Sequence, residues 1–86
     1  PLVHFDLYRL EQEYELDEIG FYDYAENPEG LVLIEWAEKF PECLPEDHIA
    51  LEIQRTDVEN ERVLVFRLAG SALQDVYKEM EKLCQF

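Results

Sequence analysis

The chain has little of what the common nucleotide-binding and membrane-spanning motifs require. It contains only three glycines in 86 residues, Gly20, Gly30 and Gly70, and they stand far apart. A phosphate-binding loop of the pattern G-x-x-x-x-G-K-[ST] is therefore absent from the sequence. No apolar run approaches the roughly 20 residues that a transmembrane helix needs, so we expect no such helix.

Cysteine and histidine are also scarce. Cys43 and Cys84 lie far apart and match no C-x-x-C spacing, and a small secreted domain would carry more cysteines. We therefore expect reduced thiols and a cytoplasmic location, with a single structural disulfide as the less favoured alternative. His4 and His48 have no second His or Cys at ligand spacing, so no zinc site is expected. No charged-then-apolar leader appears either.

Basic residues are few. Seven Lys and Arg stand against 21 Asp and Glu, for a formal net charge of −14. Nucleic-acid affinity comes mainly from neutralising phosphates, so direct contact with nucleic acid is not expected. The acidic stretch Glu11–Glu18 is usually just a solvated face, but it also offers a docking surface for a basic partner. With 48% apolar and 13% aromatic residues, the chain is no disordered acidic tail and can form a core.

The length of the chain allows one domain, which we expect to span residues 1–86. The sequence begins at Pro1 rather than Met and enters a strand-like run at once. We take this to indicate that further sequence lies upstream in the working protein. No internal repeat or low-complexity segment is present.

The first half of the chain predicts two strands with a helical connection. Leu2–Leu10 has the composition of a strand, and Glu11–Ile19 that of a short exposed helix ended by Gly20, followed by another helical turn or two at residues 21–25. Leu31–Trp36 is an unbroken apolar run of the kind that is buried on both faces of a parallel sheet.

The second half predicts an antiparallel hairpin and a helix. His48–Ile53 alternates with period two, and Arg62–Leu68 forms its partner strand. Ser71 is a candidate N-cap with Gln74 three residues later, and the residues that follow form one apolar helix face. The whole order, β-α-β-β-β-α, predicts an α/β fold whose mixed sheet has a parallel pair and a C-terminal β-hairpin with an amphipathic helix.

Two carboxylates stand where the first two strands end. Asp6 lies in the run His4–Leu10, and Glu35 follows four large aliphatic residues. Carboxylates at the carboxyl ends of parallel strands can hold Mg²⁺ or orient an attacking water. The alternative is a purely structural role, in which Asp6 pairs with Arg9 or caps a helix. Glu35 cannot lie deep in a core without a partner.

Three segments together carry a resemblance to a known family. His4–Leu10 (HFDLYRL), Glu18–Tyr24 (EIGFYDY) and Leu33–Lys39 (LIEWAEK), followed by Leu44-Pro45, resemble the TsaE (YjeE) family in order and spacing over residues 2 to 55. The later hairpin and helix agree in type only. Family members also carry a phosphate loop and a Ser-Pro-Thr-Phe segment upstream, and neither is in this sequence. The chain thus resembles the C-terminal half to two-thirds of the family.

The resemblance implies a fold and a function. It implies an incomplete P-loop NTPase-like three-layer fold, and an ATP hydrolase that uses ATP and Mg²⁺ to support the threonylcarbamoyladenosine modification of tRNA through the TsaB and TsaD proteins. Asp6 and Glu35 would be the catalytic and Mg²⁺-holding residues, and whether Glu35 is a metal ligand or a base stays open. Trp36 would lie beside the nucleotide. Phosphoryl transfer of this kind depends on positioning and charge stabilisation.

Other interpretations compete with this one. The chain could be a non-catalytic acidic interaction module, whose carboxylates serve only solubility and docking. A metal-dependent nuclease of the D…E-x-K type would need Lys at position 37, which is Ala, and the net charge also argues against it. Arg9 and Lys39 could neutralise phosphate, but their role as surface partners of the abundant Glu residues is favoured.

Overall fold

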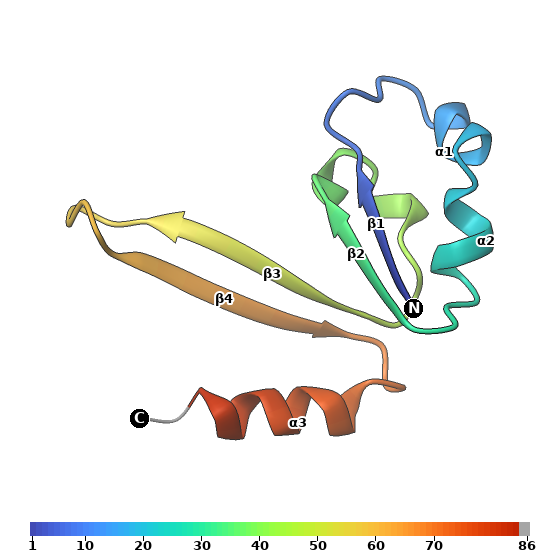
Figure 1. Ribbon diagram of the computed structural model, residues 1–86. Coiled ribbons are helices and arrows are strands. Elements are labelled where there is room, and N and C mark those ends of the chain that lie inside the picture. Colours follow the sequence, from blue (N-terminus) through green and yellow to red (C-terminus); the bar gives the residue numbers. More distant parts are fainter. Residues whose placement is uncertain (85–86) are drawn as a thin grey trace. The chain divides into compact units, whose positions relative to one another are not determined.

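The computed structural model describes residues 1–84, and their contacts divide the chain into two compact units. The first unit spans residues 1–45 and the second begins at Glu46. Figure 1 shows the elements of both, and each unit is described by itself. That residues 1–86 act as a single domain stays a prediction. None of the helices in the described part of the chain is long and apolar enough to cross a membrane.

The first unit is a β-α-α-β arrangement. Its elements are β1 (Leu2–Asp6), α1 (Tyr14–Glu18), α2 (Phe21–Ala25) and β2 (Leu31–Glu35). The strands are parallel, and the register runs from Leu2 opposite Leu31 to Asp6 opposite Glu35. Parallel neighbours need a crossover connection, which the two short helices supply. The predicted parallel pair is thereby confirmed.

Gly20 separates the two helices, as the sequence predicts. Its φ of +74° lies in the left-handed region that glycine adopts without steric cost. Its amide donates to the Asp17 carbonyl at 3.1 Å, which satisfies a carbonyl of the last turn of α1. The chain then re-enters a helix directly at Phe21.

The core of this unit lies between one face of the β1–β2 pair and the two helices. Phe5 from β1 meets Phe21 from α2 edge to face, with ring centroids 5.3 Å apart. Leu7 and Leu16 are fully buried beside them, and Cys43 closes the cluster. Burying one such large apolar side chain contributes about 1.5–3 kcal/mol, so this small cluster is the main apolar stabilisation of the unit.

The opposite face of the β1–β2 pair is open. Burial alternates along both strands, and Leu2, Leu31 and Leu33 are 65%, 59% and 47% exposed. The expectation that the run beginning at Leu31 is buried on both faces is therefore wrong for the described residues. Only the face that meets the helices is covered.

After β2 the chain forms two short 3₁₀ helices, η1 (Ala37–Lys39) and η2 (Pro41–Cys43). Pro41 stands at the first position of η2, where its missing N–H costs nothing. Cys43 is buried and Cys84 is exposed, and both are free thiols.

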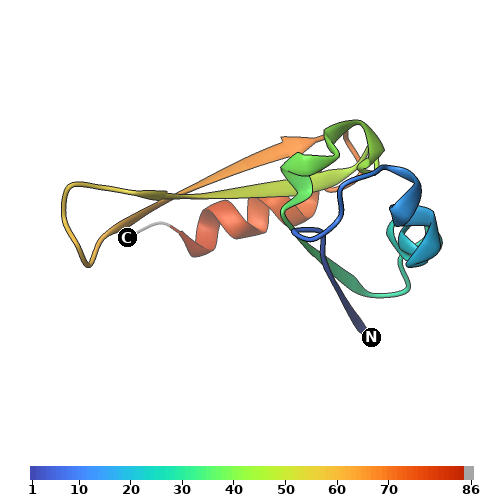
Figure 2. The same cartoon turned by 90° about the horizontal axis from the view of Figure 1, so that it is seen from above.

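The second unit is a hairpin followed by a helix. β3 (His48–Arg55) and β4 (Arg62–Ala69) pair antiparallel, with His48 opposite Ala69 and Arg55 opposite Arg62, which confirms the predicted hairpin. Two views show α3 (Gln74–Leu83) running along it (Figures 1 and 2). The Tyr77 hydroxyl joins them by donating to the Phe66 carbonyl at 3.1 Å.

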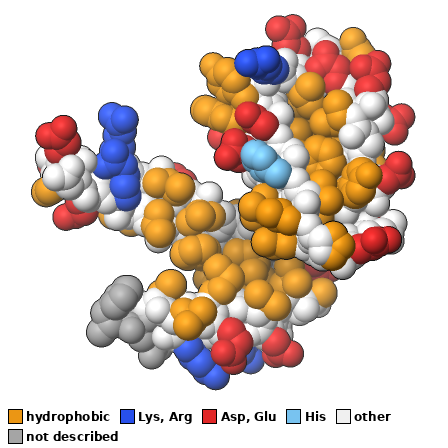
Figure 3. All heavy atoms as spheres, viewed as in Figure 1, with side chains coloured by type: hydrophobic (Ala, Val, Ile, Leu, Met, Phe, Trp, Pro, Cys, Tyr) orange, Lys and Arg blue, Asp and Glu red, His pale blue; other side chains and the backbone are white. Residues whose placement is uncertain are grey.

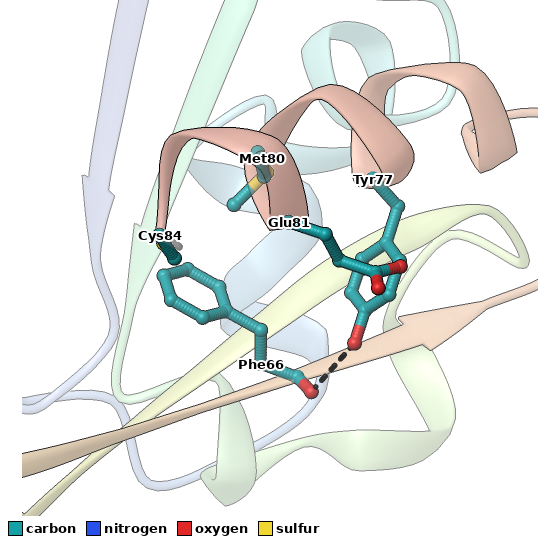
Figure 4. Close-up of a pocket in the computed structure, with 5 residues that line it drawn as sticks. All are labelled: Phe66, Tyr77, Met80, Glu81 and Cys84. Carbon is teal, nitrogen blue, oxygen red and sulfur yellow. Dashed lines mark hydrogen bonds between the residues drawn. The ribbon is translucent and has the colours of Figure 1, made fainter. Parts of the chain in front are cut away.

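A shallow pocket of about 170 Å³ lies between β4 and α3 (Figure 4). Its lining is mostly apolar and consists of Phe66, Tyr77, Met80, Glu81 and Cys84. The far half of the hairpin extends past this contact, and Ile53 and Leu64, a cross-strand pair there, are 63% and 53% exposed. The helix thus covers only part of the apolar hairpin face.

Two expectations need correction here. The four strands form two separate two-stranded sheets rather than one mixed sheet, because each strand pairs only within its own unit among the described residues. Ser71 does not cap α3, which starts at Gln74 after Leu73 and has no side-chain cap. Instead the Asp47 carboxylate accepts hydrogen bonds from the Ser71 and Ala72 amides, both at 2.9 Å. The chain is α/β, as predicted.

Candidate functional site

The two predicted carboxylates end neighbouring strands. Asp6 is the last residue of β1, Glu35 is the last residue of β2, and they are register partners in the parallel pair. Side chains alternate between the faces of a sheet, so register partners in a parallel pair leave the same face. Both residues are exposed. The structure thus brings Asp6 and Glu35 side by side at the carboxyl edge, while their chemical role stays a prediction.

The backbone at this edge is held in place from both strands. The Leu7 amide donates to the Glu35 carbonyl at 3.0 Å, which continues the pairing one residue beyond Asp6. The Asp6 Oδ1 atom then accepts a hydrogen bond from the Tyr8 amide at 3.0 Å. This is the turn in which an aspartate side chain bonds its own backbone two residues on. The composition predicted a strand that continues to Leu10, and this turn explains why β1 ends at Asp6 instead.

His4 is the basic neighbour of Glu35. Its Nε2 lies 3.6 Å from Glu35 Oε1, and the two side chains are 51% and 60% exposed. That distance is too long for a hydrogen bond. An exposed pair of this kind contributes little to stability, and the histidine is charged only when protonated. Glu35 therefore remains open to solvent and to ligands.

Trp36 follows Glu35 directly and takes an unusual backbone conformation. Its φ of 61° and ψ of 34° place it in the left-handed region, where it is the sole non-glycine residue among those described. Trp36 is 48% exposed, and its ring lies 4.9 Å from the Tyr8 ring, centroid to centroid, at 48°. Trp36 thus directly follows Glu35 in the chain, and its ring has Tyr8 as an aromatic neighbour.

Lys39 completes the cluster from the end of η1. Its Nζ donates to the Tyr8 carbonyl at 2.6 Å and lies 5.8 Å from the centre of the Tyr8 ring. The favoured expectation paired this lysine with a surface glutamate, but the structure pairs it with a backbone carbonyl. The candidate residues drawn from the sequence did not include Tyr8, which joins this cluster through its carbonyl and its ring. Its position two residues after Asp6 was the available signal.

The chemistry of Asp6 and Glu35 can be compared with what a magnesium ion requires. Two exposed carboxylates at one strand edge are the hard oxygen ligands that Mg²⁺ takes, usually together with waters and phosphate oxygens. Among residues 1–84, no group of three or more His, Cys, Asp or Glu side chains is placed to hold a metal by itself. Asp6 and Glu35 by themselves therefore supply too few ligands for a complete metal site.

The described residues offer no phosphate cradle. A turn with anion-binding geometry does occur at residues 70–72, but its amides bind the carboxylate of Asp47. Gly30 faces the Pro1 backbone, and Gly20 lies between two helices. This agrees with the missing G-x-x-x-x-G-K-[ST] loop in the sequence.

The first unit also carries a strongly acidic surface. In Figure 3 the acidic side chains gather over α1 and the segments next to it. Glu13 and Asp17 are exposed members of this surface, and the net charge of −14 adds to it. The surface has the sign expected for docking a basic partner.

Comparisons with a family model and with curated proteins point to the same family. The family model "Threonylcarbamoyl adenosine biosynthesis protein TsaE" matches residues 1–64. The chain is 32% identical over 82 residues to the "tRNA threonylcarbamoyladenosine biosynthesis protein TsaE" of Bacillus subtilis (strain 168), which covers 95% of this chain and 49% of that protein.

A protein of the same name from Haemophilus influenzae (strain ATCC 51907 / DSM 11121 / KW20 / Rd) is 45% identical over 56 residues, 65% of this chain and 35% of that protein. The matched region is thus about half the length of these relatives, or less. No solved structure matches.

Proposed function

Because this chain belongs to the TsaE family, we propose that it is part of an ATPase that supports the threonylcarbamoyladenosine modification of tRNA. The pairing of Asp6 with Glu35 at one strand edge is the observation that carries the proposal. The chain spans about half the length of the Bacillus relative, so the phosphate-binding part of the proposed ATPase is assigned to sequence beyond these residues.

In this proposal Asp6 and Glu35 act on the γ-phosphate side of the nucleotide. Mg²⁺, when bound, neutralises charge on the phosphates. The Asp6 carboxylate, fixed at one oxygen by the Tyr8 amide, has its other oxygen to offer to the metal shell or to a water. Glu35 has two exposed carboxylate oxygens and can orient the attacking water or ligate the metal. Trp36 lies beside the nucleotide.

The partners follow from charge as well as from family. A chain of net charge −14 repels RNA phosphates, so tRNA is reached through another protein. We propose the TsaB–TsaD pair as that partner, with ATP hydrolysis resetting it between rounds of modification. The acidic surface over α1 is the face we assign to it.

The proposal is tested by Glu35→Ala in the longer polypeptide that carries a phosphate loop. We expect ATP affinity to stay within about tenfold and turnover to fall by about 10² or more, the scale for losing a water-orienting or metal-holding group. Glu38→Ala, a change of the same kind at an exposed glutamate three residues later, serves as the control. Unchanged turnover in Glu35→Ala would remove this residue from the mechanism.

A non-catalytic acidic interaction module is the second candidate. The exposed acidic surface favours it, and it requires nothing of the pairing of Asp6 with Glu35. The two candidates differ in Mg²⁺-ATP binding, which isothermal titration calorimetry measures. The module predicts no binding by the longer polypeptide, and the ATPase predicts binding there but none by residues 1–86 alone.

A further inference from the structure

The backbone of Trp36 requires an explanation that the proposed catalytic roles do not give. The left-handed region brings the Cβ atom of an L-residue too close to the following carbonyl oxygen, which is why glycine or asparagine usually occupies it. A tryptophan there persists only where the surroundings over-determine the conformation. The contacts of its neighbours show what holds it.

The peptides on both sides of Trp36 are tied down. The Glu35 carbonyl accepts from the Leu7 amide at 3.0 Å, and the Trp36 carbonyl accepts from the Lys39 amide at 3.1 Å. The first bond fixes the end of β2 to the chain that follows β1, and the second forms the first turn of η1. The turn at Trp36 is therefore clamped between a strand and a 3₁₀ helix.

The side chain of Lys39 closes a ring of contacts around this turn. The backbone amide of Lys39 donates to the Trp36 carbonyl, and its ammonium group donates to the Tyr8 carbonyl at 2.6 Å. The Tyr8 ring in turn contacts the Trp36 ring. A charged donor makes a hydrogen bond stronger than a neutral one does. Tyr8 is thus joined to this turn twice, through the ammonium group of Lys39, 31 residues away, and through the ring of Trp36.

The same ring of contacts reaches both carboxylates. The Tyr8 amide donates to Asp6 Oδ1, and Glu35 is the residue immediately before the Trp36 turn. We propose that Lys39 is a positioning residue, whose ammonium group holds Tyr8 against Trp36 and thereby fixes the turn that orients Glu35 beside Asp6. Its effect on catalysis rests on the proposed ATPase function, while its effect on Trp36 does not.

The structural effect is tested by the fluorescence of Trp36 in the longer polypeptide. Each protein is compared with its Trp36→Phe counterpart, so that the difference reports this indole alone. Lys39→Met, which keeps the chain length but removes the donor, is expected to increase acrylamide quenching of Trp36, because the Tyr8 ring is released. Lys39→Arg restores a charged donor and is expected to quench as the unmodified protein does. Lys78→Met, at an exposed lysine of α3, is the control.

The catalytic effect is tested by the steady-state kinetics of ATP hydrolysis. Losing a hydrogen bond from a charged donor at an exposed site is expected to lower kcat by about tenfold in Lys39→Met, equivalent to about 1.4 kcal/mol. KM is expected to stay within about threefold, since a positioning role affects the transition state more than binding. Lys39→Arg recovers most of kcat. Lys39→Gln, which keeps a neutral donor, is the second variant if Lys39→Met does not fold. Its Trp36 quenching and its kcat are expected to lie between those of Lys39→Met and Lys39→Arg.

The outcomes separate the inference from the proposed function. Trp36 quenching that is equal in the Met, Gln and unmodified proteins overturns the inference. So does a raised KM with unchanged quenching, which would mean that Lys39 contacts the phosphates directly. An unmodified protein without ATPase activity contradicts the proposed function, while the quenching comparison still decides whether Lys39 holds the Trp36 turn.

Discussion

Replacing Gly70 by alanine tests how the turn before α3 is held. Gly70 has a φ of +74°, and a Cβ added there would stand 2.9 Å from the Glu46 carbonyl oxygen and closer still to the Asp47 carboxylate. That carboxylate accepts hydrogen bonds from the Ser71 and Ala72 amides. The substitution therefore strains the backbone and displaces Asp47 together.

The expected cost follows from these two effects. The left-handed conformation costs alanine about 1–2 kcal/mol. Displacing the Asp47 carboxylate from two amides at 2.9 Å costs about 1–2 kcal/mol more at this partly exposed site. Gly70→Ala should thus lower the free energy of unfolding by about 3 kcal/mol. Gly20→Ala is the matched control, since its φ is also +74° but the nearest atom to its Cβ is the Tyr24 side chain at 3.7 Å.

A double-mutant cycle measured by urea denaturation decides whether the reasoning holds. Asp47→Ala alone removes the carboxylate and should cost about 1–2 kcal/mol. In that background Gly70→Ala no longer displaces the Asp47 carboxylate. The double mutant should therefore lose about 1–2 kcal/mol less free energy of unfolding than the sum of the losses in the two single mutants. The explanation is refuted if the two costs simply add, or if Gly70→Ala costs no more than Gly20→Ala.

Two titrations test the electrostatics of the units. The pKa of Tyr22 is raised to about 12, mainly by a hydrogen bond with the Cys43 thiol and secondly by burial. A tyrosinate absorbance step near pH 12 should therefore vanish in Tyr22→Phe. The stability that Tyr22 contributes is complete below pH 10 and should be lost as the pH rises toward 12. The Arg67 hydrogen bond at 2.9 Å lowers the pKa of Glu52, so Arg67→Gln should raise it in a carboxyl NMR titration, with little change in stability at neutral pH because the pair is exposed.

Local patterns in the sequence predicted much of this fold. Gly20 ends α1, the alternation of β3 identifies the hairpin, and the acids at the ends of two apolar strands predicted their place at one edge. These features succeed because each depends on residues close in the chain or on the period of a strand. The side-by-side placement of Asp6 and Glu35 needed one further rule, that parallel strands align their carboxyl ends.

Features that depend on distant residues were not predictable in this way. The capping box at Ser71 was locally sound, but Asp47, 24 residues earlier, takes the amides instead. Likewise Lys39 had many nearby glutamates to pair with, and the structure pairs it with the carbonyl of Tyr8, 31 residues away. In both places a tertiary contact replaces the local one, and a single sequence contains no signal for that choice.

The open face of the β1–β2 pair bears on how the carboxylates work. Leu2 and Leu33 leave the same face as Asp6 and Glu35, because residues two and four apart on a strand share a face. Large aliphatics exposed there are typical of a surface that another structure covers.

In the proposed ATPase, a structure that covers those leucines would leave the two carboxylates at its rim, with less water around them. Fixed charges stabilise a transition state more strongly where water is excluded, so such a cover would strengthen the proposed catalytic role of Asp6 and Glu35.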